Sequence, residues 1–243
     1  DIAVVGDFDP AQVTALMQEH FGNWTSAKAY ERIPMPLVLA PTVVQMLETP
    51  DKANAVIIQS GQFPLSNSHP DYAALLVANN IFGGGGMKSR LGDRVRQTDG
   101  LSYSVGSGFN ASTLDESASQ QLFAIAAPEN IAKVKQAFAE EMARLVKDGV
   151  TEAELKDAVD GLLKGRVLGR AEDAALTGQL RSNLYYDRTM AWSAELEAKM
   201  AALTKAEVDA AIRKHFGAAG YSVFAAGDFA KAAAAKPEAA ATT

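Results

Sequence analysis

The chain has 243 residues, of which 48% are apolar and 21% charged, as is usual for a folded globular protein. Its formal net charge of −6 argues against non-specific binding to nucleic acid, and it contains no apolar run long enough to span a membrane. It has no cysteine, which excludes disulfides, thiolate zinc sites and cysteine nucleophiles.

The first 22 residues predict a short strand followed by a helix. The strand is DIAVVG at 1–6. Asp9 offers an N-cap for the helix, Pro10 suits its first position, and Gly22 suits its C-terminal end.

The end of the chain repeats this pattern in reverse order. GDF and HFG occur at 6–8 and 20–22, and again at 227–229 and 215–217. We therefore expect residues 1–22 to be the closing strand and helix of an upstream domain, whose body precedes the first residue.

Residues 23–42 contain prolines and little periodicity, which predicts a linker. The main domain is expected at 43–230. It begins with two strands, VVQMLE at 43–48 and NAVIIQSGQ at 54–62. The segment from 70 to 82 predicts a buried helix that ends at a run of glycines.

A second helix is predicted after the glycines, with Met87, Leu91 and Val95 on its inward face. Alternating strands are predicted at LSYSVGSGF (101–109), QQLFAIAA (120–127) and YSVFAAG (221–227), and a long helix at 130–147. Capping boxes, Thr151 with Glu154 and Thr204 with Glu207, begin two further helices.

These elements predict an α+β fold, a two-layer sandwich in which helices pack on one face of a largely antiparallel sheet. The Ala-rich segment 231–243 predicts a disordered tail.

Four consecutive glycines, Gly83, Gly84, Gly85 and Gly86, are the most unusual feature, because such a run costs backbone entropy and adds no side-chain packing. A phosphate-binding P-loop is excluded, since the run follows a helix pattern and the required glycine positions hold other residues.

Metal ligands and hydrolase nucleophiles lack the spacing that their chemistry needs. The three histidines, His20, His69 and His215, are far apart, and no H-E-x-x-H or H-x-x-E-H occurs. No G-x-S-x-G elbow is present either. We expect no metal site in this chain.

Arg96 and Tyr103 follow the glycines, seven residues apart, with GLSY at 100–103. The residues alone favour a surface pair between Arg96 and Asp93. They also favour a core position for Tyr103, which shares its strand face with Val105. An alternative buries the ring of Tyr103 and directs its hydroxyl toward Arg96. Gly92, one turn before Arg96, leaves room for another backbone.

With this R-x6-Y spacing, the glycine run and the GDF and HFG endings, the chain resembles the C-terminal, non-zinc half of the pitrilysin/insulinase zinc peptidases, relatives of mitochondrial processing peptidase. The resemblance implies that Arg96 and Tyr103 are catalytic and that Gly83–Gly86 contact a peptide substrate. It also implies that zinc belongs to a missing N-terminal half or a separate subunit, and that this chain is inactive alone.

Two other roles stay open within the same family. The alternatives are a catalytically silent structural or assembly subunit, and the non-zinc partner subunit of a heteromeric peptidase. Resemblance to exported bacterial zinc proteases favours the periplasm.

Overall fold

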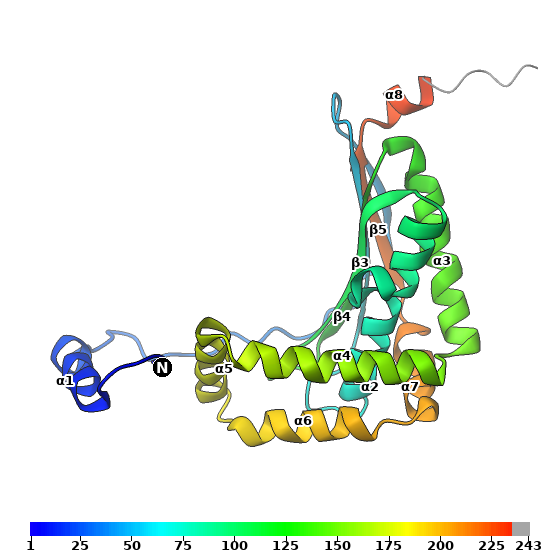
Figure 1. The fold of residues 1–243 in the computed structure, drawn as a ribbon. Coiled ribbons are helices and arrows are strands. Elements are labelled where there is room, and N and C mark those ends of the chain that lie inside the picture. The colour runs from blue at the N-terminus through cyan, green and yellow to red at the C-terminus, as the bar shows by residue number, and fades with distance from the viewer. Residues whose placement is uncertain (235–243) are drawn as a thin grey trace, which may run out of the picture.

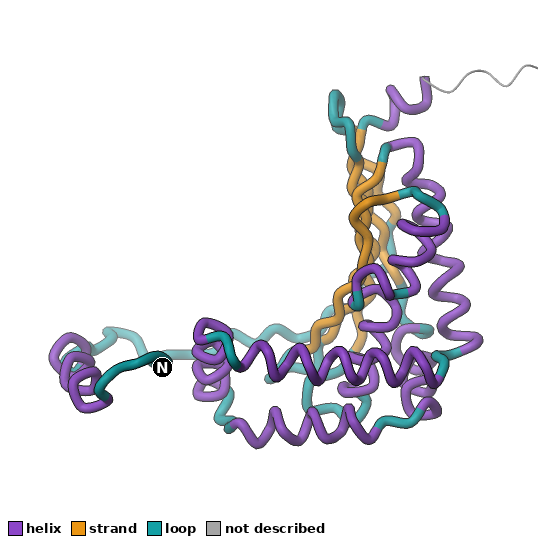
Figure 2. The backbone as a smooth tube through the Cα atoms, in the orientation of Figure 1, coloured by secondary structure: helices purple, strands orange, loops and turns teal. Residues whose placement is uncertain are grey.

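The structure, a computed structural model, describes residues 1–234 and consists of one five-stranded sheet with helices on one side of it (Figures 1 and 2). The strands are β1 (Val44–Glu48), β2 (Ala55–Phe63), β3 (Ser102–Ala111), β4 (Ala118–Ala126) and β5 (Tyr221–Gly227). Their order is β1-β5-β2-β4-β3, with β1 and β5 parallel and the other pairs antiparallel. The predicted α+β fold is confirmed.

The helices are α1 (Pro10–Phe21), α2 (Tyr72–Asn79), α3 (Ile131–Asp148), α4 (Glu152–Arg170), α5 (Asp173–Tyr185), α6 (Met190–Ala202), α7 (Lys205–Ala211) and α8 (Phe229–Ala234). α2, α3 and α7 lie along the sheet, whereas α4 and α6 extend away from it and α5 lies at their far ends (Figure 1). No helix within residues 1–234 has the length and apolar character needed to cross a membrane.

The core lies between the sheet and the helices. Along β2, Ile57 and Phe63 point into it, whereas Val56, the residue before Ile57, is exposed on the other face. Phe82, which follows α2, and Phe216, which follows α7, are fully buried against this face of the sheet. This alternation explains why helices cover one face of the sheet and leave apolar side chains on the other.

Residues 1–6 form no strand in this structure, and the closing strand expected there stays a prediction. No described residue pairs with residues 1–6, and a strand requires a neighbour for its backbone hydrogen bonds. The helix after it is confirmed as α1, because the side chain of Asp9 accepts hydrogen bonds from the backbone N–H groups of Ala11 and Gln12.

Residues 23–42 form neither helix nor strand, but side chains tie them to the main domain. Arg32 makes a two-pronged ion pair with Asp115, with nitrogen–oxygen distances of 2.7 and 3.0 Å. Tyr30 packs edge-on against Tyr185 of α5.

Three further predictions changed in detail. The helix expected at 70–82 begins at Tyr72 and continues through a π-helical turn, Asn80–Gly84, so it includes the first glycines. Met87 does not share the buried face of Leu91 and Val95, since it is 56% exposed. Of the tail expected to be disordered, residues up to Ala234 belong to α8 and 235–243 lie outside the described part.

Both predicted capping boxes are confirmed. Thr151 begins α4 and Thr204 begins α7, and in each case the glutamate three residues later accepts a hydrogen bond from the N–H of the threonine.

Candidate functional site

The glycine run lies between α2 and the edge strand β3. Gly83 is buried, and a side chain there would collide with β3, since a Cβ atom would lie 2.6 Å from the backbone nitrogen of Ser107. Gly84, Gly85 and Gly86 are exposed, and Gly86 has a φ of +67° that favours glycine. Gly83 thus serves close packing, while the following three present bare backbone.

The exposed glycines are fixed to the helix that carries Arg96. Ser89 donates to the carbonyl of Gly86 (2.6 Å) and accepts from the N–H of Gly92 (3.1 Å), which caps the helix. A Cβ atom on Gly92 would clash with the carbonyl oxygen of Gly86. The space that Gly92 was predicted to leave for another backbone is therefore confirmed, and Gly86–Met87 fills it.

Arg90 anchors the same segment to α4. Its Nε and Nη2 atoms donate to the two carboxylate oxygens of Glu154 at 2.7 and 2.9 Å, and Nη2 also reaches the carbonyl of Gly149. Burial acts to raise the pKa of Glu154, but the hydrogen bonds from Arg90 and from the N–H of Thr151 outweigh it and lower this pKa to about 2.

A cleft of about 690 Å³ runs beside the glycine backbone. Gly84 and Gly85 line one side of it, and residues of α4 line the other, including Asp157 and Gly161. The backbone of Gly84 and Gly85 therefore borders the cleft.

Tyr103 occupies a β-bulge in β3. Ser102 pairs with Ala126 and Ser104 with Ile125, so Tyr103 has no partner residue on β4. The Oγ atom of Ser102 lies 2.7 Å from the carbonyl oxygen of Ile125 and accepts from the N–H of Ser104, which stabilises the bulge. As a result the side chain of Tyr103 is 81% exposed. The predictions of a core tyrosine and of a buried ring are both wrong, because the bulge shifts the strand's alternation by one residue.

Arg96 lies over the ring of Tyr103. Its Cζ atom is 4.3 Å from the ring centroid, a distance typical of a cation–π contact. The predicted surface pair with Asp93 does not form, and no ion pair to Arg96 occurs within residues 1–234. The structure therefore brings the two predicted site residues together on the surface, with the guanidinium not neutralised by a described carboxylate.

The turn before β3 makes this contact possible. Gly100 has a φ of +61°, and the N–H of Leu101 donates to the carbonyl of Val95 at 2.9 Å. The strand consequently starts beside the last turn of the helix, within reach of Arg96.

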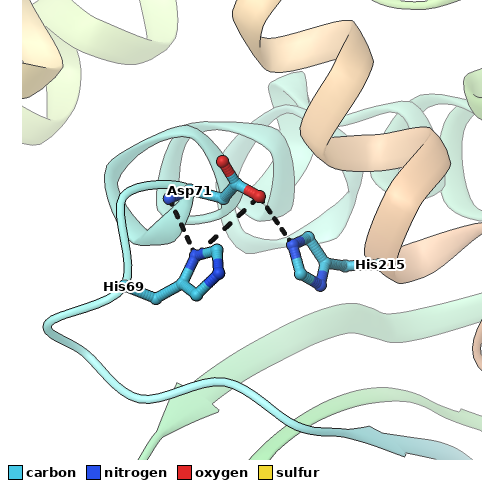
Figure 3. A group of neighbouring side chains, drawn as sticks. All are labelled: His69, Asp71 and His215. Atoms are coloured by element: carbon cyan, nitrogen blue, oxygen red, sulfur yellow. Dashed lines mark hydrogen bonds and ion pairs between the residues drawn. The ribbon is translucent and has the colours of Figure 1, made fainter.

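A cluster that the sequence did not reveal joins His69, Asp71 and His215 (Figure 3). His215 Nε2 lies 2.8 Å from Asp71 Oδ2, and the N–H of Asp71 donates to His69 Nδ1 at 3.0 Å. One ligand atom from each residue lies within 4.8 Å of the others. No local spacing predicts this cluster, because His215 is 144 residues from Asp71.

The cluster's donors do not fit a divalent metal. Lys214 Nζ lies 2.8 Å from the same oxygen, Asp71 Oδ2, so a cation there would meet an ammonium group and displace two hydrogen bonds. Burial lowers the pKa of His215, and Asp71 opposes this effect. The arrangement is a hydrogen-bonded brace between the start of α2 and the segment after α7.

Comparisons with known proteins identify the family and the fold. The peptidase M16 inactive domain family matches residues 1–162, more than half of the chain. An uncharacterized zinc protease of Mycobacterium leprae is 30% identical over 190 residues, covering 77% of this chain and 42% of its own length.

Two solved structures share the fold. A peptidase M16 inactive domain from Pseudomonas fluorescens is 25% identical with a TM-score of 0.76, and it is matched over 92% of this chain and 52% of its own. A protease from Helicobacter pylori, 16% identical, has the same TM-score and is matched over 92% of this chain and 53% of its own.

The chain spans about half the length of these relatives. The match to the family and the zinc-protease relative confirm the resemblance that the sequence suggested: the chain belongs to the peptidase M16 family, as its inactive domain.

Proposed function

We propose that this chain is the substrate-binding domain that completes the active site of a zinc metalloendopeptidase. Zinc would be held by an N-terminal half of the same polypeptide or by a separate subunit, and the chain alone would be inactive. The observation that carries the proposal is the exposed contact between Arg96 and Tyr103, 4.3 Å from guanidinium carbon to ring centroid.

The contact provides what the facing half of such an enzyme needs. Zinc supplies polarisation of the scissile carbonyl and activation of water. The guanidinium of Arg96 and the hydroxyl of Tyr103 donate hydrogen bonds to the substrate backbone and to the oxygen that gains negative charge. The ring of Tyr103 also holds the guanidinium in position, which lowers the cost of orienting it.

The glycine segment suits a peptide ligand. Gly84, Gly85 and Gly86 carry no side chains that would collide with an extended chain, and the cleft beside them has a volume of about 690 Å³. Gly86 packs against Gly92, so the glycine segment lies beside the helix that carries Arg96. Gly83 was also expected to contact the substrate, but it is buried against Ser107 of β3 and positions the exposed glycines that follow it.

The same proposal extends to the organisation of the chain. Residues 43–230 form the domain, 23–42 connect it, and 1–22 close an upstream domain. In support, α1 buries none of its residues, and the apolar side chains of Leu16 and Phe21 are exposed. An apolar helix face of this kind needs another body to cover it.

The first test uses the complete enzyme. Arg96→Ala and Tyr103→Phe are each expected to lower kcat about a hundredfold, the usual effect of losing one donor to a developing oxyanion. Zinc content should not change. Arg213→Ala, which removes another exposed guanidinium, is the control and should retain activity.

Unchanged kcat in both site variants would support the alternative of a catalytically silent structural subunit. Loss of zinc from either variant would mean that the two residues act on the metal site and not on the substrate.

A further inference from the structure

A pocket of about 400 Å³ lies where the C-terminal end of α4 meets α5 and the start of α6. Three arginines, Arg166, Arg170 and Arg188, line it, and none of its described lining residues is acidic. In a chain with a net charge of −6, this concentration of cations calls for an explanation. The proposed peptidase role does not use the pocket.

Arg188 is held in place without a counter-ion. Its Nη2 atom donates to the side-chain oxygens of Asn67 (2.9 Å) and Ser68 (3.0 Å), and its Cζ atom lies 4.4 Å from the ring centroid of Trp192. No carboxylate among residues 1–234 forms an ion pair with it. The guanidinium is therefore oriented by neutral groups, and its other N–H groups remain available.

The direction of the pKa shift of Arg188 agrees with the absence of a described carboxylate beside it. Burial lowers its pKa, and the nearby Tyr72 and Tyr186 oppose this effect. A guanidinium stays protonated at any ordinary pH, so the positive charge persists in the pocket.

The other two arginines share one carboxylate. Arg166 Nε lies 2.8 Å from Glu197 Oε1, and Arg170 Nη2 lies 3.2 Å from Oε2. Three guanidinium groups against one carboxylate leave two positive charges at the pocket.

The side-chain amide of Asn183 provides a neutral hydrogen-bond donor at the pocket. Asn183 is buried, and its Nδ2 atom contacts Met190 Sδ at 3.6 Å, which is a weak acceptor. The amide therefore keeps hydrogen-bonding capacity for a ligand.

We infer that this pocket binds a small dianion that offers oxygen acceptors, either a phosphate group or a dicarboxylate. Two uncompensated charges match a dianion, and the planar fork of Arg188 suits paired oxygens. The site is separate from Arg96 and Tyr103. Tyr103 lies at the start of β3, whereas the pocket is lined by Thr113, beyond the other end of that strand, and by residues toward α5 (Figure 1).

Calorimetric titration of the full chain at constant ionic strength tests the inference. The probes are inorganic phosphate and succinate, with chloride as the reference anion. Saturable binding of phosphate alone identifies a phosphate site, binding of succinate alone a dicarboxylate site, and binding of both a general dianion site. Absence of saturable heat with either probe in the millimolar range overturns the inference.

Variants locate the binding. Arg188→Gln should weaken it about tenfold or more, as expected for the loss of a charged hydrogen-bond donor. Gln179 also lines the pocket, and Gln179→Glu is a nearly isosteric change that places a carboxylate there. This carboxylate should compete with the ligand for the arginines, so binding should weaken in a protein that still folds. Arg213→Gln lies outside the pocket and should bind as the wild type does. If both pocket variants bind like the wild type, the inference is wrong.

Discussion

Arg96 and Tyr103 meet because two local backbone features act together. The left-handed conformation of Gly100 turns the chain back toward the helix, and the bulge at Ser102–Ser104 turns the ring of Tyr103 outward. Without the bulge, regular alternation would place Tyr103 on the same face as Val105, as the sequence predicted. The contact thus depends on single residues and not on the fold class.

A tetrahedral inhibitor distinguishes oxyanion stabilisation from simple peptide binding. In the complete enzyme, Arg96→Ala should weaken a phosphinic peptide, which mimics the tetrahedral transition state, about a hundredfold, and a substrate-like peptide much less. The inhibition constant of the phosphinic peptide and the dissociation constant of the substrate-like peptide, each measured for the wild type and the variant, give the two effects to be compared. Equal weakening of both ligands would assign Arg96 to uniform substrate binding only.

Glu154 gives a prediction on pH dependence. Glu154→Gln keeps an acceptor for the N–H of Thr151 but removes the charge that faces Arg90, so the free energy of unfolding should fall by about 3 kcal/mol near neutral pH.

The folded-state pKa of Glu154, about 2, lies below its usual value near 4.5, so its stabilising effect is complete above pH 4.5 and is lost as pH falls toward 2. Urea unfolding at several pH values should show the wild type and the variant converging over this range. A constant difference between them would mean that the charge of Glu154 is not the cause.

At the scale of elements, much of the fold was accessible from sequence patterns. Apolar alternation located β2 to β5, and the capping boxes located the starts of α4 and α7. The start of the chain was not predictable in the same way, because a strand at 1–6 depends on a partner strand and not on its own residues. The prediction for Met87 failed for a local reason. Ser89 is extended and ends the short turn Gly86–Lys88 before Leu91, so Met87 is not on the same helix as Leu91.

The glycines also show where a pattern stops being informative. The run predicted a segment of bare backbone, but only coordinates separate Gly83, packed against Ser107, from the exposed residues that follow. The role of Gly92 was predictable as space for a backbone, whereas the backbone that fills it was not.

Replacement of Gly92 tests how the glycine segment is held. Gly92→Ala places a methyl group against the carbonyl of Gly86 and should lower the free energy of unfolding by about 2 kcal/mol. Gly165→Ala is the control: it lies in α4 with open space around it and should raise stability by about 1 kcal/mol. Thermal unfolding of both variants measures the effects, and equal stabilisation of both would show that Gly86 moves aside without cost.

For the whole molecule, two surfaces expose apolar side chains. The sheet face opposite the helices keeps Val56, Phe123, Ile125 and Phe224 exposed, and α1 has no buried residue. The chain also spans about half the length of its relatives.

The His69–Asp71–His215 cluster and the arginine pocket were not predictable, since each gathers residues from distant parts of the sequence.

Reconstitution from two halves tests the central proposal most directly. The zinc-bearing half is produced separately, and its kcat/KM for peptide hydrolysis is measured alone, with this chain, and with the Arg96→Ala chain. We predict little activity alone, restoration by the wild-type chain, and about a hundredfold less restoration by the variant at equal binding. Full activity of the zinc-bearing half alone, or equal restoration by both chains, would contradict the proposal.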